Sequence, residues 1–330
     1  MSEFRFEVNL VHMAPIIDFH CHVFPDPTQG KLSPLVDPYL AKLKPLTQLL
    51  SRKIHDLIPN IRHLPSPLAQ IIDELGVPSV LPLFLIDHSA AHLLKEMAEV
   101  GVTQAVIIAH PPLASNEFIL KLASEHPELI AAVNITPAVE GKSDVLKKYH
   151  EEGAKILKIH PAFDGKGPDY EGYHELLATA SELKMPVILH TGCIHSHLMY
   201  KNPSFGDVTL FESWFSQYRE IKFVLAHMNY HSPNVALDIA ERNENCLVDT
   251  SWQPSEIIAE AVRRIGPSRV LFGTDWPIVG NNFNVGISRI HECVTAKTIS
   301  DQDSEQILGL NALNLLELRE AGAKSEVGAE

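Results

Sequence analysis

Short apolar runs recur along the chain and predict buried strands. Each run is rich in Val, Ile and Leu and lacks the alternation of apolar and polar positions that marks a strand with one face in water. Strands of this kind are covered on both faces, as in parallel sheets flanked by helices. The runs expected as strands are residues 15–20, 102–110, 129–136, 154–160, 186–191, 222–227, 246–251 and 269–275.

The segments between these runs predict amphipathic helices, and several begin at Ser or Asn and end at Gly or Pro. The alternation of strands and helices predicts an α/β fold, a (β/α)8 TIM barrel in a single domain. A doubly wound open sheet is the alternative, but the chain lacks the glycine fingerprint with which such sheets bind dinucleotides. The expected helices include residues 115–128, 174–184, 235–244, 254–266 and 304–320.

The connection after the first strand is much longer than the others. Residues 23–87 contain 10 of the 23 prolines and an amphipathic stretch at 40–58. An insertion at this place follows a barrel strand at the catalytic face, so it predicts a lid over the pocket or, alternatively, a packing or oligomer surface. We therefore expect an N-terminal extension at 1–14, the barrel at 15–320 and a disordered tail at 321–330.

Composition and charge narrow the class of protein. The chain is 45% hydrophobic and 21% charged, which is typical of a soluble globular enzyme and excludes a disordered chain. No apolar run is long enough for a transmembrane helix, and the N-terminus lacks the apolar run of a signal peptide. A net charge of −14 argues against a nucleic-acid partner. The 4 cysteines form no Cys-x-x-Cys pair, which favours a reduced, cytoplasmic protein. The partner expected for a chain of this class is a small-molecule substrate.

A His-x-His motif ends the first predicted strand. Residues two apart on a strand share a face, so His20 and His22 should project together with Asp18, while Cys21 points the opposite way into the core. Two neutral imidazoles on one face supply half of a metal site.

Three further strands end in an ionisable side chain. His190 ends the fifth strand, His227 the sixth and Asp275 the eighth. The carboxyl ends of barrel strands meet at one rim, so we expect these side chains to converge with the His-x-His motif. The alternative is that they are hydrogen-bonded rim residues of a sugar- or phosphate-binding barrel.

With these motifs the chain resembles the amidohydrolase superfamily, and the segment ILGLNALNLLEL resembles the terminal helix of its amidohydrolase-related branch, which includes aminocarboxymuconate-semialdehyde decarboxylase. The resemblance spans roughly residues 15–318. It implies that His227 handles the substrate or the metal-bound water. It also implies a set of metal ligands: His20, His22, His190 and Asp275.

The fourth strand carries a further candidate. The sequence LKIHP puts Lys158 and His160 on one face, and His160 is expected to line the pocket. In dihydroorotase-like relatives a carbamylated lysine at the matching place bridges two metals, whereas many members of the decarboxylase branch hold one metal. Lys158 is therefore either such a bridge or a charged group that holds a substrate carboxylate. Zinc fits the nitrogen-rich ligand set best and manganese is the alternative, with one or two ions.

Two reactions fit this site. In the first, a metal-activated water attacks an amide, ester or lactone, Asp275 acts as general base and then acid, and His227 polarises the carbonyl. The second is non-oxidative decarboxylation of a small carboxylic acid, with Arg52, Arg62 or Lys158 near the departing carboxylate. The KIHP strand favours hydrolysis slightly.

Other classes of metal barrel fit less well. A TatD-like nuclease would prefer Glu on the fourth strand and a basic groove, and a polymerase-and-histidinol-phosphatase barrel would want further His and Glu ligands. A metal that only braces a binding protein is a third alternative. Cys193 is expected to line the pocket, and Asp249 or Thr250 to support it. The sequence leaves the oligomeric state open; since relatives are often homodimers, a homodimer is one possible assembly.

Overall fold

The computed structural model describes residues 14–25, 71, 89–192, 197, 199–278 and 283–317. Its strands form one sheet of eight, each strand parallel to its neighbour and placed in sequence order. They are β1 (Ile16–Cys21), β2 (Val102–Ile108), β3 (Leu129–Asn134), β4 (Ile156–Ile159), β5 (Val187–Leu189), β6 (Phe223–Leu225), β7 (Cys246–Asp249) and β8 (Val270–Leu271).

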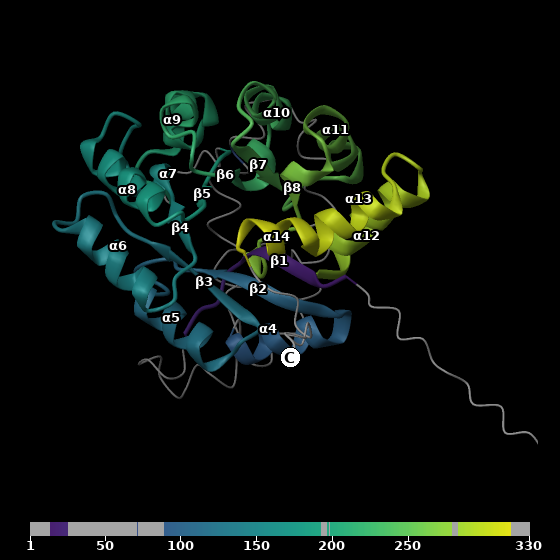
Figure 1. The fold of residues 1–330 in the computed structure, drawn as a ribbon, viewed down its shortest axis with the longest axis horizontal. Helices are drawn as coiled ribbons and strands as arrows, with labels where there is room; N and C mark the ends of the chain where they lie inside the picture. Colours follow the sequence, from purple (N-terminus) through teal and green to yellow (C-terminus); the bar gives the residue numbers. More distant parts are fainter. Residues whose placement is uncertain are drawn as a thin grey trace, which may run out of the picture.

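The sheet closes on itself where β8 meets β1. The amide of Phe19 donates to the carbonyl of Phe272 at 2.8 Å, and the amide of Asp275 donates to the carbonyl of His20 at 2.7 Å. The helices surround the strands (Figure 1). The predicted (β/α)8 barrel is therefore confirmed.

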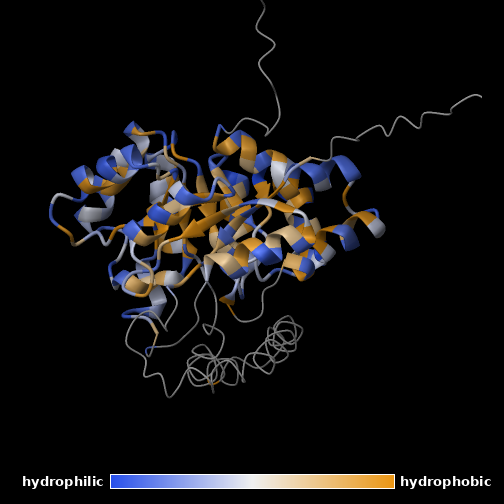
Figure 2. Cartoon of the chain, turned by 90° about the horizontal axis from the view of Figure 1, so that it is seen from below, coloured by the Kyte–Doolittle hydropathy of each residue, from blue (hydrophilic) through white to orange (hydrophobic). Residues whose placement is uncertain are grey.

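Hydrophobic residues gather on the strands and on the inner sides of the helices (Figure 2). Helix α5 begins at a serine as the sequence predicts, because the hydroxyl of Ser115 accepts a hydrogen bond from a backbone amide of the first turn; Ser89 caps α4, which the sequence analysis did not predict, in the same way. The α-helices are α4 (Ala90–Val100), α5 (Asn116–Glu125), α6 (Lys142–Glu151), α7 (Pro161–Asp164), α8 (Glu171–Glu182), α9 (Glu212–Gln217), α10 (Pro233–Arg242), α11 (Ser255–Ile265), α12 (Phe283–Thr295), α13 (Asp301–Glu305) and α14 (Asn311–Leu315). Short 3-10 segments are η3 (Pro203–Gly206), η4 (Val208–Phe211), η5 (Ala226–Asn229) and η6 (Pro267–Arg269), and η8 (Gln306–Leu310) is a π-helical turn.

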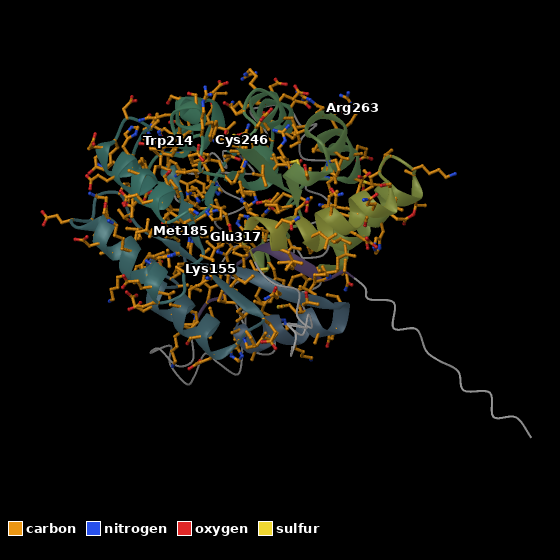
Figure 3. The ribbon with its side chains drawn as sticks, in the orientation of Figure 1. Lys155, Met185, Trp214, Cys246, Arg263 and Glu317 are labelled. Atoms are coloured by element: carbon orange, nitrogen blue, oxygen red, sulfur yellow. The ribbon has the colours of Figure 1, made fainter. Side chains whose placement is uncertain are left out.

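The core has two layers. One lies between strands and helices and includes Trp214 of α9, labelled in Figure 3. Its ring packs edge-on against Tyr173 of α8 at 5.2 Å between ring centroids. The other fills the barrel interior and includes Leu313 and Leu316 beside the strand residues. Gly309 allows this approach, because a Cβ there would lie 1.7 Å from the Pro15 carbonyl oxygen. The C-terminal helices thus close the end of the barrel where the strands begin, which leaves the opposite end for a site.

Several predicted elements end differently or lie elsewhere. The run at 269–275 is a strand only over Val270–Leu271, and the helix expected at 304–320 consists of α13, the π-helical turn and α14. The extension at 1–14, the insertion at 23–87 and the tail at 321–330 lie almost wholly outside the described residues, so the predicted lid and disordered tail stay predictions. Within the described ranges, no helix has the length and apolar character needed to cross a membrane.

Candidate metal centre

The ends of β1 and β8 bring together two imidazoles and a carboxylate. Asp275 Oδ1 lies 3.5 Å from His20 Nε2 and 3.2 Å from His22 Nε2. One ligand atom from each of these residues lies within 4.8 Å of the others. All of them are buried, and Trp252 Nε1 donates to the other carboxylate oxygen, Asp275 Oδ2, at 2.7 Å. The convergence that the sequence predicts for these residues is therefore present.

Strand β1 does not alternate in the simple way expected. Its pairing with β2 shifts register between Asp18 and Cys21. Cys21 packs in the outer layer as predicted, but Phe19 packs in the barrel interior, so Asp18 does not share the face of His20. Asp18 instead accepts hydrogen bonds from the amide and hydroxyl of Thr274 at 3.1 and 2.6 Å. This contact ties β1 to the segment that carries Asp275.

Asp249, at the end of β7, contacts both His20 and His227. Its Oδ2 lies 2.9 Å from His20 Nδ1. Its Oδ1 accepts hydrogen bonds from the amides of His227 and Ser251 at 3.1 and 3.0 Å, and from the Ser251 hydroxyl. A carboxylate in this position holds the proton on His20 Nδ1, so the lone pair of Nε2 faces Asp275. Of the two supporting residues that the sequence suggests, Asp249 makes these contacts, whereas the Thr250 hydroxyl bonds the backbone of Gly273.

His227 follows β6 in a left-handed backbone conformation, with a φ of 58°. Its Nδ1 lies 2.7 Å from the Ser251 hydroxyl oxygen. Because that hydroxyl donates to Asp249, it must accept from His227 Nδ1–H, which leaves the lone pair on Nε2. The ring centroid lies 4.7 Å from that of His20 and 5.2 Å from that of His190.

The ends of β4 and β5 form the other side of the site. The His160 and His190 rings stack at 3.7 Å with an interplanar angle of 12°. His160 Nδ1 accepts the amide of Phe163 at 3.3 Å and so caps α7. Lys158 Nζ and His190 Nε2 are buried and have no hydrogen-bond partner in the described part of the chain. His190 falls outside the groups of three in which every ligand atom lies within 4.8 Å of the others, so its role as a ligand stays a prediction.

Burial controls the charge of these groups. It holds the pKa of His20, His190 and His227 well below the usual value, so the rings are neutral. Burial also lowers the pKa of Lys158 to about 8, although the charges of Asp275 and Asp249 oppose this shift. For Asp275, burial acts to raise the pKa, but His22, His20 and Trp252 together bring it below the usual value, so this carboxylate is ionised.

The site fits a divalent metal by the chemistry of its donors. Metal ligands are neutral imidazoles and ionised carboxylates; His20 and Asp275 supply one of each, and His22 adds a second imidazole within the same group. Asp275 Oδ1 is buried, and although His22 Nε2 lies 3.2 Å away, the oxygen accepts no well-oriented hydrogen bond within the described structure, which is costly unless another group satisfies it. A cation beside this oxygen would satisfy it.

Some residues of the site were not predicted from the sequence. Ser251 and Trp252 contact His227 and Asp275, and both follow β7 directly, so the rule that selects residues at strand ends could have found them. The capping role of His160 and its stacking on His190 have no sequence signal. Cys193 lies outside the described residues, and so do Arg52 and Arg62.

The comparisons with known proteins agree with the fold. A family model described as amidohydrolase matches residues 17–318. An uncharacterized TIM-barrel protein from Bordetella bronchiseptica has a solved structure with a TM-score of 0.64 and 18% identity, covering 92% of this chain and 99% of its own.

Two similar structures are described as enzymes. A dihydroxybenzoic acid decarboxylase from Polaromonas, with bound manganese and the inhibitor 2-nitroresorcinol, has a TM-score of 0.59 and 16% identity, covering 93% of this chain and 98% of its own. A probable 2-pyrone-4,6-dicarboxylic acid hydrolase from Acinetobacter baumannii has a TM-score of 0.56 and 13% identity, covering 92% and 99%. No curated protein matches the chain. Because the family model covers most of the sequence, the chain belongs to the amidohydrolase family.

Proposed function

We propose that the protein is a metal-dependent hydrolase that cleaves an amide, ester or lactone bond of a small molecule. The observation that carries the proposal is the open oxygen of Asp275, buried beside neutral imidazoles and held by Trp252 through the other oxygen. His20, His22, His190 and Asp275 would hold the ion. When bound, a divalent metal supplies a Lewis acid and lowers the pKa of a water ligand from about 15.7 to about 7.

Asp275 and His227 would move the protons. The carboxylate of Asp275 would take a proton from the attacking water and return it to the leaving group. His227 presents an Nε2 lone pair, because its Nδ1–H is directed to Ser251. It can therefore accept a proton, or a hydrogen bond from a hydroxyl group, of the reactants, and it stabilises a developing oxyanion only after it is protonated.

Lys158 would bind the acyl oxygen or a carboxylate of the substrate. Its ammonium is the natural partner for an anion, since Nζ is buried without a partner from the described residues. Carbamylation of Lys158 as a bridge between two metals is the alternative. Intact-mass and carbon-dioxide-dependence measurements separate these roles, because only the carbamate requires carbon dioxide.

Non-oxidative decarboxylation of a small carboxylic acid is the second candidate. The manganese-containing decarboxylase from Polaromonas has a similar fold, and the unpartnered Lys158 offers a cation for a carboxylate. Among the arginines of the described structure, Arg263 lies on the outer surface of α11 (Figure 3), and Arg289 donates to the backbone carbonyl of Gln253 at 2.9 Å. A single lysine is a weaker carboxylate site than an arginine, and for this reason we favour hydrolysis.

We propose zinc or manganese as the ion, a homodimer as the assembly and the cytoplasm as the location. Neutral imidazoles suit zinc, whereas the manganese in the Polaromonas enzyme and the carboxylate of Asp275 support manganese. Cys21, Cys246 and Cys293 are free, which agrees with a reducing compartment.

One experiment tests the function and separates the two reactions. The purified protein is analysed for metals and then incubated in ¹⁸O-labelled water with panels of small esters, lactones, amides and aromatic acids. Hydrolysis predicts ¹⁸O in the acid product and no carbon dioxide, whereas decarboxylation predicts carbon dioxide and no label. His20→Ala and Asp275→Ala should lose both metal and turnover without unfolding of the barrel. Full turnover in either variant would contradict the proposed site.

A further inference from the structure

The segment after β6 is the most unusual piece of backbone near the site. Four consecutive residues, His227 to Tyr230, have positive φ angles of 58°, 45°, 59° and 37°. Residues other than glycine normally visit this region singly, because Cβ comes too close to the following carbonyl oxygen. A run of four persists only where the surrounding structure fixes it. We call residues 227–230 the left-handed turn.

Gln253 holds this turn from the β7 side. Its side chain is fully buried, and Nε2 donates to the carbonyl of His227 at 2.5 Å and to that of Tyr230 at 3.3 Å. These carbonyls belong to the first and last residues of the turn, so one side-chain amide fixes both of its ends. The turn itself is closed by the amide of Tyr230, which donates to the carbonyl of His227 at 2.7 Å.

Two residues from the β5 side complete the support. The Thr191 hydroxyl donates to the carbonyl of Ala226 at 2.5 Å and accepts the amide of Asn229 at 3.0 Å. Gly192 leaves room for Tyr230, because a Cβ on Gly192 would lie 2.6 Å from the Tyr230 Cβ. The turn is therefore clamped between the ends of β5 and β7.

We propose that Gln253 is a positioning residue for His227, which it acts on by holding the left-handed turn. A change of φ at His227 swings the Cα–Cβ bond, so relaxation of the turn would carry the imidazole away from Ser251 and from His20. Gln253 acts on His227 through the backbone carbonyl, to which its Nε2 donates. This inference rests on the proposed function only where it assigns chemistry to His227; the part that concerns the backbone stands alone.

The test is Gln253→Met, which keeps the length of the side chain and removes both hydrogen bonds. Gln104→Met is the matched control, since Gln104 Nε2 also bonds a carbonyl, that of Pro127, near the start of β2. Crystal structures without substrate report the φ angles of the turn, and metal analysis and steady-state kinetics follow. We expect a rearranged turn, unchanged metal content, and kcat lowered about 100-fold with KM within about twofold. The control should match the wild type.

A second substitution distinguishes a role in the turn from general support of the fold. Asn229→Gly places glycine, which tolerates positive φ, within the turn. The double variant Asn229→Gly/Gln253→Met should regain the left-handed turn and at least about tenfold in kcat, and it provides a folded sample if Gln253→Met alone does not fold. A melting temperature that recovers without the turn or kcat would overturn the proposal.

The crystal structures test the positioning role of Gln253, and the kinetics test the proposed role of His227, so each claim can be refuted without the other. An unchanged turn in Gln253→Met refutes the positioning role whatever happens to activity. A rearranged turn with undiminished kcat supports the positioning role but removes His227 from the proposed mechanism. If the wild-type protein hydrolyses nothing in the panel, the proposed function fails, while the crystal structures still decide the role of Gln253.

Discussion

Replacing Asp249 by asparagine should weaken metal binding without unfolding the barrel. The backbone amides of His227 and Ser251 both donate to Oδ1. A backbone N–H can only donate, so the atom at the Oδ1 position must remain an acceptor. The carboxamide oxygen of asparagine must therefore occupy the Oδ1 position, which turns the NH2 group toward His20 Nδ1. His20 then has to accept there, and its proton moves to Nε2, the atom that faces Asp275.

The size of the effect follows from this change of tautomer. Loss of a carboxylate that orients a metal-binding histidine typically lowers metal affinity about 10–100-fold, which is about 1.4–2.8 kcal/mol. The measurement is competition between metal-stripped protein and a fluorescent chelator, for Zn²⁺ and for Mn²⁺ separately. The melting temperature should change little, because the substitution removes a buried charge and keeps the shape of the side chain.

Asp164→Asn provides the control for a generic effect of removing a carboxylate. Asp164 accepts the hydroxyl of Tyr173 at 2.8 Å and contacts none of the proposed ligands. It should keep wild-type metal affinity. If Asp249→Asn is folded and also binds metal as tightly as the wild type, Asp249 does not set the tautomer of His20 and this account of the site is wrong.

Three further outcomes are expected. Trp252→Phe removes the hydrogen bond to Asp275 Oδ2 and should lower kcat about tenfold at constant melting temperature. A tenfold loss of metal affinity as well would show that Trp252 orients Asp275 as a metal ligand and not as a base. Lys158 has a pKa of about 8 in the folded chain and 10.5 ordinarily, so the unfolded state binds more protons between these values and stability should rise with pH across them. Lys158→Met should abolish that rise and stabilise the protein by up to about 3 kcal/mol at pH 7, as chemical denaturation would report. Prolonged chelation should remove turnover, and added Zn²⁺ or Mn²⁺ should restore it; turnover that survives chelation would exclude a metal-dependent reaction.

The positions of the site residues could be predicted because they follow from strand geometry. An apolar run that ends in His or Asp places that side chain at the rim of a parallel barrel, and this single rule locates His20, His22, His227 and Asp275. The same rule also placed His190 at the rim, where it lies beside His227. The barrel itself follows from the alternation of buried runs with amphipathic helices.

The orientation of these side chains could not be predicted, since it depends on contacts between distant segments. The register shift in β1 turns Asp18 away from the face of His20, although strict alternation would place them together. The left-handed turn at His227 contains no glycine that would announce it, and the residues that hold it are Thr191 and Gln253. The pattern of apolar and polar residues around His227 does not reveal partners that lie so far away in the sequence.

Because the positions of the site residues can be predicted and their orientations cannot, the sequence identifies the family more readily than the reaction. The donor set depends on strand ends, and the family model covers them from residue 17 to 318. The choice between hydrolysis and decarboxylation depends on the protonation state of each side chain in the site and on the direction in which that side chain points. Those properties come from Asp249, Ser251 and Trp252, each of which acts on a histidine or carboxylate from another strand. Substitutions at these supporting residues are therefore the more selective probes of the proposed mechanism, because loss of a proposed ligand such as His20 would abolish either reaction.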